Sequence, residues 1–251
     1  SAGYKPGAET MIHAISIGYK WLVIYPTLVI STLVLGPMLI LLSFIGLADQ
    51  GSSILATRWA RINLRCCLIN ANITGLDHIQ AGQSYIIAAN HQSLIDIFLV
   101  YGFSPVEFKW VMKTELGAVP ILGTACKAMG HILIDRSNPQ SAISSINEAA
   151  KKISNGMCIV FFPEGTRSDN ESVMPFKKGA FRLAIELGIP ILPISLHNTG
   201  NLVPNGTLNW KPGQVSMQIH EPIATHLLTP DNVNDLKDRT RQQIINALTQ
   251  P

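Results

Sequence analysis

A histidine and an aspartate lie five residues apart in one short polar segment, Asn90-His91-Gln92-Ser93-Leu94-Ile95-Asp96. A carboxylate that fixes the tautomer of an imidazole is the usual arrangement of a general base, the group that removes a proton from a reacting hydroxyl. In a regular helix this spacing would separate the two side chains by about 140°. They can therefore meet only if His91 lies in a loop and Asp96 in the first turn of the helix that follows.

The same segment also has a purely structural interpretation. Ser93 and Asp96 have the spacing of a capping box, in which a side chain three residues into the helix accepts a hydrogen bond from the backbone N–H of the capping residue. In that case Asp96 would stabilise the start of the helix and take no part in chemistry. At the level of the sequence both interpretations of Asp96 stay open.

A second polar segment, Phe162-Pro163-Glu164-Gly165-Thr166-Arg167-Ser168, follows a short apolar run. Gly165 permits close approach of the backbone, and Glu164 and Arg167 face a common turn. The planar guanidinium of arginine forms paired hydrogen bonds with phosphate. The segment lacks the Gly-Lys-Ser/Thr signature of a nucleotide-binding P-loop. It is therefore a candidate phosphate site of a different kind.

Two further basic positions allow more than one interpretation. Arg136 follows Asp135 at the end of a predicted strand, where it is either a second phosphate ligand or the ion-pair partner of Asp135. The pair Lys177-Lys178 precedes an amphipathic stretch, and such a pair is more typical of a solvated helix start than of a ligand site.

Other kinds of chemistry have no sequence signal. No Gly-x-Ser-x-Gly elbow occurs, which disfavours a serine lipase or esterase. The cysteines form no CxxC pair, which argues against a zinc cage or a disulfide framework and favours a reducing, cytosol-facing compartment. No metal or cofactor is expected. The net charge is only +3 and the basic residues are spread along the chain, which argues against a nucleic-acid binder.

Trp21–Ala48 is a stretch of 28 residues without Asp, Glu, Lys or Arg. As one helix it would measure about 42 Å, against about 30 Å for the hydrocarbon core of a bilayer. Pro26 and the pair Gly36-Pro37 interrupt the stretch, and proline kinks or breaks helices. We expect either one kinked, tilted span or a helical hairpin that turns at Gly36-Pro37 and dips into one leaflet.

The residues around this stretch support a membrane-bound protein. Residues 1–10, which precede Met11, are interpreted as an expression remnant. After the stretch, Arg58, Arg61 and Arg65 share one edge of a predicted amphipathic helix. Such an edge suits an anionic membrane surface, although it is also compatible with an ordinary solvated helix packed on a core.

From about residue 68 onward, short apolar runs alternate with helical stretches, which predicts an α/β fold. We expect a central, mostly parallel or mixed sheet of about seven strands flanked by helices, with functional loops at the carboxyl ends of the strands. The expected strands are Leu68–Thr74, Tyr85–Ala89, Phe108–Met112, His131–Ile134, Met157–Phe161, Ile191–Leu196 and Val215–Ile219. The expected helices lie near 94–103, 139–154, 176–187 and 233–249.

Taken together and in order, four sequence blocks closely resemble those of the glycerolipid acyltransferase family. The resemblance covers roughly residues 60–225, and relatives that acylate different acceptors share the first and third blocks. The blocks are Asn90-His91-x-Ser93-x-x-Asp96, Lys113-x-Glu115-Leu116 with Gly130-x-Ile132-x-Ile134-Asp135-Arg136, Phe162-Pro163-Glu164-Gly165-Thr166-Arg167-Ser168, and Pro190-Ile191-Leu192-Pro193-Ile194.

The resemblance implies an α/β acyltransferase domain at 51–251, preceded by a membrane-embedded two-helix motif at 11–50. It implies that His91, oriented by Asp96, removes the proton of the sn-2 hydroxyl of lysophosphatidic acid. The hydroxyl oxygen then attacks the thioester of acyl-CoA or acyl carrier protein, with no covalent enzyme intermediate, and phosphatidic acid is formed. The residues implied to bind the glycerol phosphate are Lys113, Arg136, Glu164, Gly165, Thr166 and Arg167.

Because acceptor and product are bilayer lipids, the catalytic domain is expected on the cytoplasmic face of a membrane, which is the inner membrane in a bacterium. Three alternatives stay open. The acceptor is glycerol-3-phosphate or another lysolipid; the protein is a thioester hydrolase, in which the same histidine activates water; or it is a membrane-binding protein without activity.

Overall fold

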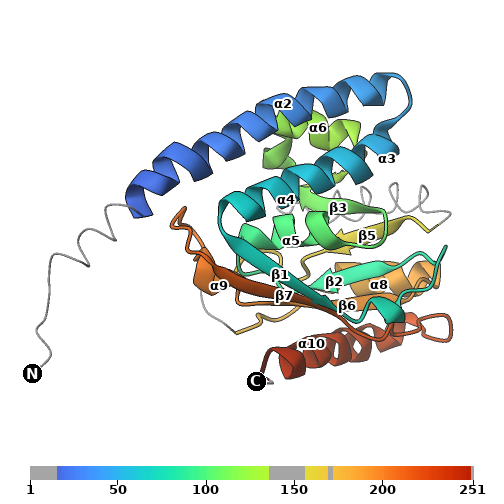
Figure 1. The fold of residues 1–251 in the computed structure, drawn as a ribbon. Helices are drawn as coiled ribbons and strands as arrows, with labels where there is room; N and C mark the ends of the chain where they lie inside the picture. Colours follow the sequence, from blue (N-terminus) through green and yellow to red (C-terminus); the bar gives the residue numbers. More distant parts are fainter. Residues whose placement is uncertain (1–15, 136–155, 169–171, 250–251) are drawn as a thin grey trace, which may run out of the picture.

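The computed structural model describes residues 16–135, 156–168 and 172–249 (Figure 1). All seven expected strands are present, each within two residues of its expected ends, and they form one sheet in the order β1-β7-β6-β2-β5-β3-β4. Only β6 and β7 pair antiparallel, so the expected mixed sheet is confirmed. The strands are β1 (Ile69–Thr74), β2 (Ile86–Ala89), β3 (Phe108–Lys113), β4 (Ile132–Ile134), β5 (Cys158–Phe161), β6 (Ile191–His197) and β7 (Gly213–Ile219).

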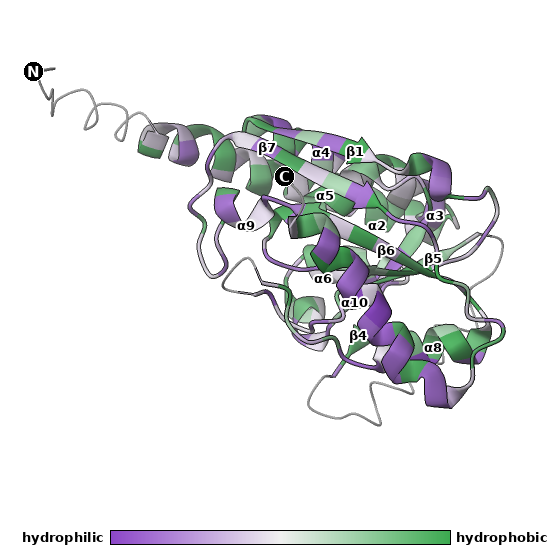
Figure 2. Cartoon of the chain, turned by 90° about the horizontal axis from the view of Figure 1, so that it is seen from below, coloured by the Kyte–Doolittle hydropathy of each residue, from purple (hydrophilic) through white to green (hydrophobic). Residues whose placement is uncertain are grey.

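Helices cover both faces of the sheet, so the central strands are buried on both sides. Every residue of β2 and β5 is buried, as expected for apolar strands in the middle of a covered, parallel sheet. One face packs against α4 (Thr57–Cys66) and α5 (Ile95–Phe103), and the other packs against α8 (Gly179–Leu187) and α10 (Val233–Thr249). Figure 2, which views the molecule from the α10 side, shows hydrophilic residues on the outward surface of α10.

Three of the four expected helices are confirmed as α5, α8 and α10, and the one near 139–154 lies outside the described residues. Several short helices were not expected from the sequence. They are 3-10 turns η3 (Leu76–His78), η4 (Thr114–Ala118) and η5 (Pro230–Asn232), and helices α6 (Leu122–Ala128) and α9 (Thr199–Leu202).

Residues 21–44 of the apolar stretch lie in one unbroken helix, so of the two expected courses the hairpin that turns at Gly36-Pro37 is wrong. The helix covers Ser16–Phe44, which is 29 residues, and by length and composition it is able to cross a membrane. It includes a π-helical turn, η1 (Lys20–Ile24), and α2 (Tyr25–Phe44), with Pro37 inside α2. An interior proline removes only one hydrogen bond of the helix, and in apolar helices this loss is commonly tolerated.

The chain turns only at residues 45–47, where Gly46 has a φ of +78° that glycine adopts without strain. It then returns through α3 (Ala48–Gly51) and a π-helical turn, η2 (Ser52–Ala56), into α4, which runs back along α2 (Figure 1). Trp59 Nε1 donates a hydrogen bond to Thr32 Oγ1 at 3.0 Å and thereby joins α4 to α2. A helical hairpin is therefore present, but its second arm is the arginine-bearing helix.

The outer face of α2 is bare. Only 6% of the most apolar 18-residue window of the helix Ser16–Phe44 is buried, and Leu22 in η1 and Phe44 at the end of α2 are 80% and 81% exposed. On the returning arm, Arg61 is bound to the α/β domain. Its Nε donates a hydrogen bond to Gly102 O at 2.7 Å, and its guanidinium lies over the ring of Phe103. Arg58 and Arg65, on the same arm, are exposed.

Candidate active site

The catalytic pair expected from the first block meets in the structure. His91 lies in the loop after β2, and Asp96 is the second residue of α5, which is the placement that the spacing requires. His91 Nδ1 and Asp96 Oδ2 are 2.8 Å apart. The carboxylate is fully buried, whereas the histidine side chain is 16% exposed. A buried carboxylate thus fixes an imidazole whose other edge lies toward the surface.

Asp96 also fulfils the structural interpretation. Its Oδ2 accepts hydrogen bonds from the backbone N–H groups of Gln92 and Ser93 at 2.7 and 2.8 Å. Ser93 Oγ in turn accepts a bond from the N–H of Ile95 at 3.2 Å, so two side-chain oxygens hold the backbone at the start of α5. One carboxylate oxygen of Asp96 therefore fixes the loop before the helix and orients the histidine at the same time.

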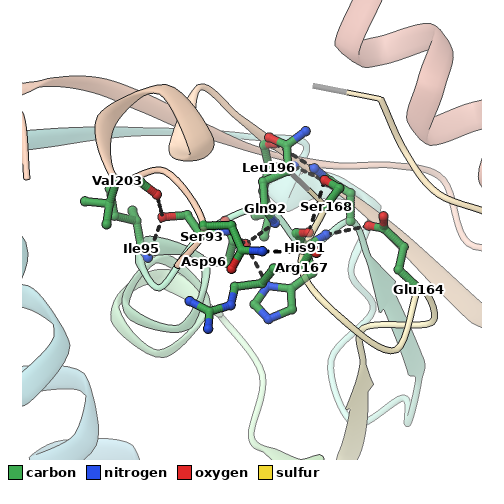
Figure 3. A network of polar contacts seen from close by, with 12 residues as sticks. His91, Gln92, Ser93, Ile95, Asp96, Glu164, Arg167, Ser168, Leu196 and Val203 are labelled. Atoms are coloured by element: carbon green, nitrogen blue, oxygen red, sulfur yellow. Dashed lines mark hydrogen bonds and ion pairs between the residues drawn. The ribbon is translucent and has the colours of Figure 1, made fainter. Parts of the chain in front are cut away.

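Glu164 holds the histidine loop from the neighbouring strand. It is 4% exposed, its Oε1 accepts the backbone N–H of His91 at 2.7 Å, and its Oε2 accepts that of Met174 at 2.8 Å (Figure 3). Burial raises the pKa of Glu164 to about 7, and the two N–H bonds oppose this shift only in part. Both oxygens are engaged by the backbone, so Glu164 positions His91; its implied contact with the acceptor stays a prediction.

The rest of the third block wraps around the histidine. Ser168 N donates to His91 O at 3.0 Å, and the Phe162 ring stacks on the imidazole with 3.8 Å between ring centroids. Gly165 makes the turn with a φ of +81°. Arg167 is half-buried, and Figure 3 shows its side chain on the same side of the loop as the His91 ring. Thr166 is exposed.

The second block places Lys113 at the end of β3, the strand that pairs with β5. Lys113 ends β3, parallel to β5, so its loop opens at the same edge of the sheet as the histidine loop. Its side chain is 53% exposed, and its Nζ lies 3.6 Å from Glu115 Oε1. Arg136 lies outside the described residues, so both interpretations of it stay predictions.

Two supporting residues were not singled out from the sequence. The fully buried Asn90 forms a two-way clamp with Leu196 of β6: its Nδ2 donates to the carbonyl at 2.9 Å and its Oδ1 accepts the N–H at 2.8 Å. Phe162 supplies the ring under the imidazole. An asparagine directly after a buried strand was the available signal for the clamp. No group of three His, Cys, Asp or Glu able to hold a metal occurs among the residues that the structure describes.

Comparison with curated proteins finds relatives that are named 1-acyl-sn-glycerol-3-phosphate acyltransferases. The 1-acyl-sn-glycerol-3-phosphate acyltransferase alpha of Homo sapiens is 33% identical over 71% of this chain and 64% of its own length. The Saccharomyces cerevisiae 1-acyl-sn-glycerol-3-phosphate acyltransferase is 34% identical over 72% of this chain and 60% of its own. The match to the chloroplastic enzyme BAT2 of Brassica napus covers 49% of that protein. The chain thus spans about half to two thirds of these relatives.

A solved structure and a family profile complete the comparison. The crystal structure of the 1-acyl-sn-glycerophosphate (LPA) acyltransferase PlsC from Thermotoga maritima superposes with a TM-score of 0.72 at 25% identity, over 94% of this chain and 93% of that one. Residues 70–197, which contain all the described site residues, match the profile of the acyltransferase family. The chain therefore belongs to the acyltransferase family.

Proposed function

We propose that this protein transfers a fatty acyl group from the thioester of acyl-CoA or acyl carrier protein to the sn-2 hydroxyl of lysophosphatidic acid, giving phosphatidic acid. The observation that carries the proposal is the buried Asp96 carboxylate bound to His91 Nδ1 at 2.8 Å, directly beside the arginine loop. The names of the relatives and of the solved PlsC structure support this choice of acceptor.

In the proposed reaction His91 Nε2 accepts the proton of the acceptor hydroxyl. Nδ1 is committed to Asp96, and Nε2 makes no hydrogen bond within the described part of the chain, so it is the nitrogen available to substrate. The hydroxyl oxygen forms a bond to the thioester carbonyl carbon, and the carbon–sulfur bond breaks. The departing thiolate takes the proton back from His91. The negative Asp96 stabilises the imidazolium between these two proton transfers.

The acceptor phosphate is proposed to bind on the cationic side of the same edge. Arg167 is five residues beyond Phe162, whose ring stacks on His91, and Lys113 ends β3, which pairs parallel with β5. The proposed phosphate-binding residues also include Gly165, Thr166 and Arg136, of which Arg136 lies outside the described residues. A guanidinium and an ammonium on neighbouring strand ends are suited to a phosphate monoester.

The bare face of α2 is proposed to lie in the membrane that holds acceptor and product. The exposed large apolar residues of this face, which includes the helical turns that precede α2, are Ile17, Trp21, Leu22, Val29, Ile30, Leu33, Val34, Met38, Leu41 and Phe44. A soluble surface rarely exposes so continuous an apolar band, whereas burial in lipid removes it from water. With the catalytic domain on the cytoplasmic face, the water-soluble thioester donor has free access to His91.

An acceptor panel tests the proposed reaction. The full chain is incubated with one acyl-CoA and, separately, lysophosphatidic acid, glycerol-3-phosphate or lysophosphatidylcholine in vesicles, and acylated products are measured by mass spectrometry. Phosphatidic acid is the expected main product, and His91→Ala is expected to abolish it. His226→Ala, which changes an exposed histidine, is the matched control. A higher kcat/KM for another acceptor would overturn the assignment of lysophosphatidic acid.

A further inference from the structure

One residue next to the membrane helix has a strained backbone. Ile121 has φ +63° and ψ −57°, and the N–H of Leu122 donates to Pro120 O at 2.7 Å. These values define a γ-turn of the rare positive-φ kind. For a β-branched residue such a φ is an outlier. Strain of this type persists only where the surroundings hold it in place.

Ile121 packs against Gly36 of α2. A Cβ placed on Gly36 would lie 2.7 Å from Ile121 Cγ2, so the isoleucine occupies the space that the missing side chain leaves. Cγ2 is attached directly to Cβ, so it has little freedom to move away. This contact gives a reason for a glycine in the apolar helix at the position where the sequence suggested a break.

The γ-turn is packed rigidly onto the segment that follows Lys113. A Cβ on Gly123 would lie 2.4 Å from Gly117 O, which means that the two backbones are in direct contact. The N–H of Gly123 donates to Val119 O at 2.7 Å. The turn η4 starts immediately after Lys113 and ends at Ala118. Ile121 is therefore joined to Lys113 by a short stretch of backbone that closes on itself through these two contacts.

We propose that α2 positions the acceptor-binding lysine through the Gly36–Ile121 contact and thereby sets how well the site binds its lysolipid. Gly36 and Ile121 are positioning residues, since they act through Lys113 and touch no reacting atom. This inference rests on the proposed function, because that function assigns Lys113 to the acceptor phosphate. The membrane helix then aligns the acceptor site in addition to attaching the protein to lipid.

Gly36→Ala in the full chain tests the proposal, with Gly18→Ala as its matched control. Both glycines lie in the same helix, but a Cβ on Gly18 meets nothing within 4 Å. Initial rates are measured with lysophosphatidic acid in phosphatidylcholine vesicles and with acyl-CoA. Gly36→Ala is expected to lower kcat/KM for the acceptor by about 10- to 100-fold, the range for a misplacement of up to an ångström. The loss is expected as a higher acceptor KM, while the donor KM stays unchanged and Gly18→Ala keeps the wild-type kinetics.

A second substitution separates the contact from a general effect on folding. In Gly36→Ala/Ile121→Ala the Cγ2 is gone, so the added methyl group fits, and the acceptor KM is expected to return toward the wild-type value. Should Gly36→Ala fail to fold, Ile121→Gly replaces it, because glycine makes the turn without strain while the contact with Gly36 is lost. That variant is expected to keep its thermal stability and raise the acceptor KM.

Three results would overturn the inference: a Gly36→Ala enzyme with the kinetics of Gly18→Ala, a double variant no better than Gly36→Ala, or an Ile121→Gly enzyme with normal acceptor KM. Absence of phosphatidic acid from the wild-type chain is a different outcome, because it refutes the proposed function itself. The wild-type assay therefore distinguishes the two failures.

Discussion

Replacing Asp96 with asparagine removes the charge of the carboxylate that we propose supports His91 and keeps its shape. Asp96 Oδ2 accepts three hydrogen bonds of 2.7–2.8 Å, from His91 Nδ1 and from two backbone N–H groups. An asparagine oxygen can keep all three. Its amide group then takes the place of the buried Oδ1, for which the described residues offer no hydrogen-bond partner.

The two roles of Asp96 predict effects of different size. A buried amide without a partner costs about 1–3 kcal/mol of stability, which a domain of ordinary stability, about 5–15 kcal/mol, survives in the folded state. Loss of the charge that supports the imidazolium is expected to lower kcat by about 10²–10⁴-fold. Steady-state kinetics and thermal unfolding on the same preparation separate these effects.

A remote helix cap provides the control for Asp96→Asn. Thr229 forms a capping box with Asn232 at η5, where Thr229 N donates to Asn232 Oδ1 at 2.8 Å. Thr229→Ala is expected to cost about 1 kcal/mol of stability and leave kcat unchanged. If Asp96→Asn also shows a lower Tm with near-normal kcat, Asp96 acts only as a cap and the reasoning about the pair is refuted.

Three further substitutions give testable outcomes. Arg167→Ala is expected to raise the acceptor KM by about 10- to 150-fold, the effect of losing a charge-assisted hydrogen bond, while Arg182→Ala on the exposed side of α8 leaves it unchanged; equal damage to donor and acceptor use would contradict a phosphate pocket. Because the pKa of Glu164 is raised from its ordinary 4.5 to about 7, the folded state binds this proton more tightly than the unfolded chain, so the free energy of unfolding falls as pH rises through this window. In urea titrations, the free energy of unfolding of Glu164→Gln is expected to fall less over this pH range than that of the wild type. Parallel pH profiles of this free energy for the two proteins would disprove the link to the Glu164 proton. Leu22→Ser is expected to weaken vesicle binding in flotation assays, whereas Leu227→Ser, at a residue that is 83% exposed and lies outside the apolar helix, is not; equal binding by both would argue against docking through the helix Ser16–Phe44.

The sheet was predictable because its signals are local. Short apolar runs bounded by glycine or proline marked the strands, and the fully buried β2 and β5 correspond to continuous apolar runs. The order of the strands was not predictable in the same way, because it depends on pairing between residues far apart in the chain. β2, for example, pairs with β5 and β6 and with neither of its neighbours in sequence.

The sequence left open whether the apolar segment turns at Gly36-Pro37, because the outcome depends on tertiary contacts. The pair Gly36-Pro37 has the local features of a helix break, yet Gly36 lies against Ile121, which is 85 positions away in the sequence. Gly46, which shows no such signal beyond being a glycine after an apolar run, makes the actual turn. Local propensity therefore identified the unusual residue and assigned it the wrong role.

The candidate site was predictable in its residues and only partly in its geometry. The spacing of His91 and Asp96 required a loop followed by a first helical turn, and both are present. The contact of Glu164 with the His91 backbone depends on the pairing of β2 with β5, so the sequence alone did not indicate it.

The most direct test of the central claim is the stoichiometry of thiol release and lipid formation. The full chain is supplied with acyl-CoA, with and without lysophosphatidic acid, and free CoA thiol and phosphatidic acid are measured in the same reaction. We predict equal amounts of both, dependent on the acceptor and lost in His91→Ala. Release of thiol without an acceptor, or phosphatidic acid formation that persists in His91→Ala, would contradict general-base acyl transfer by this histidine.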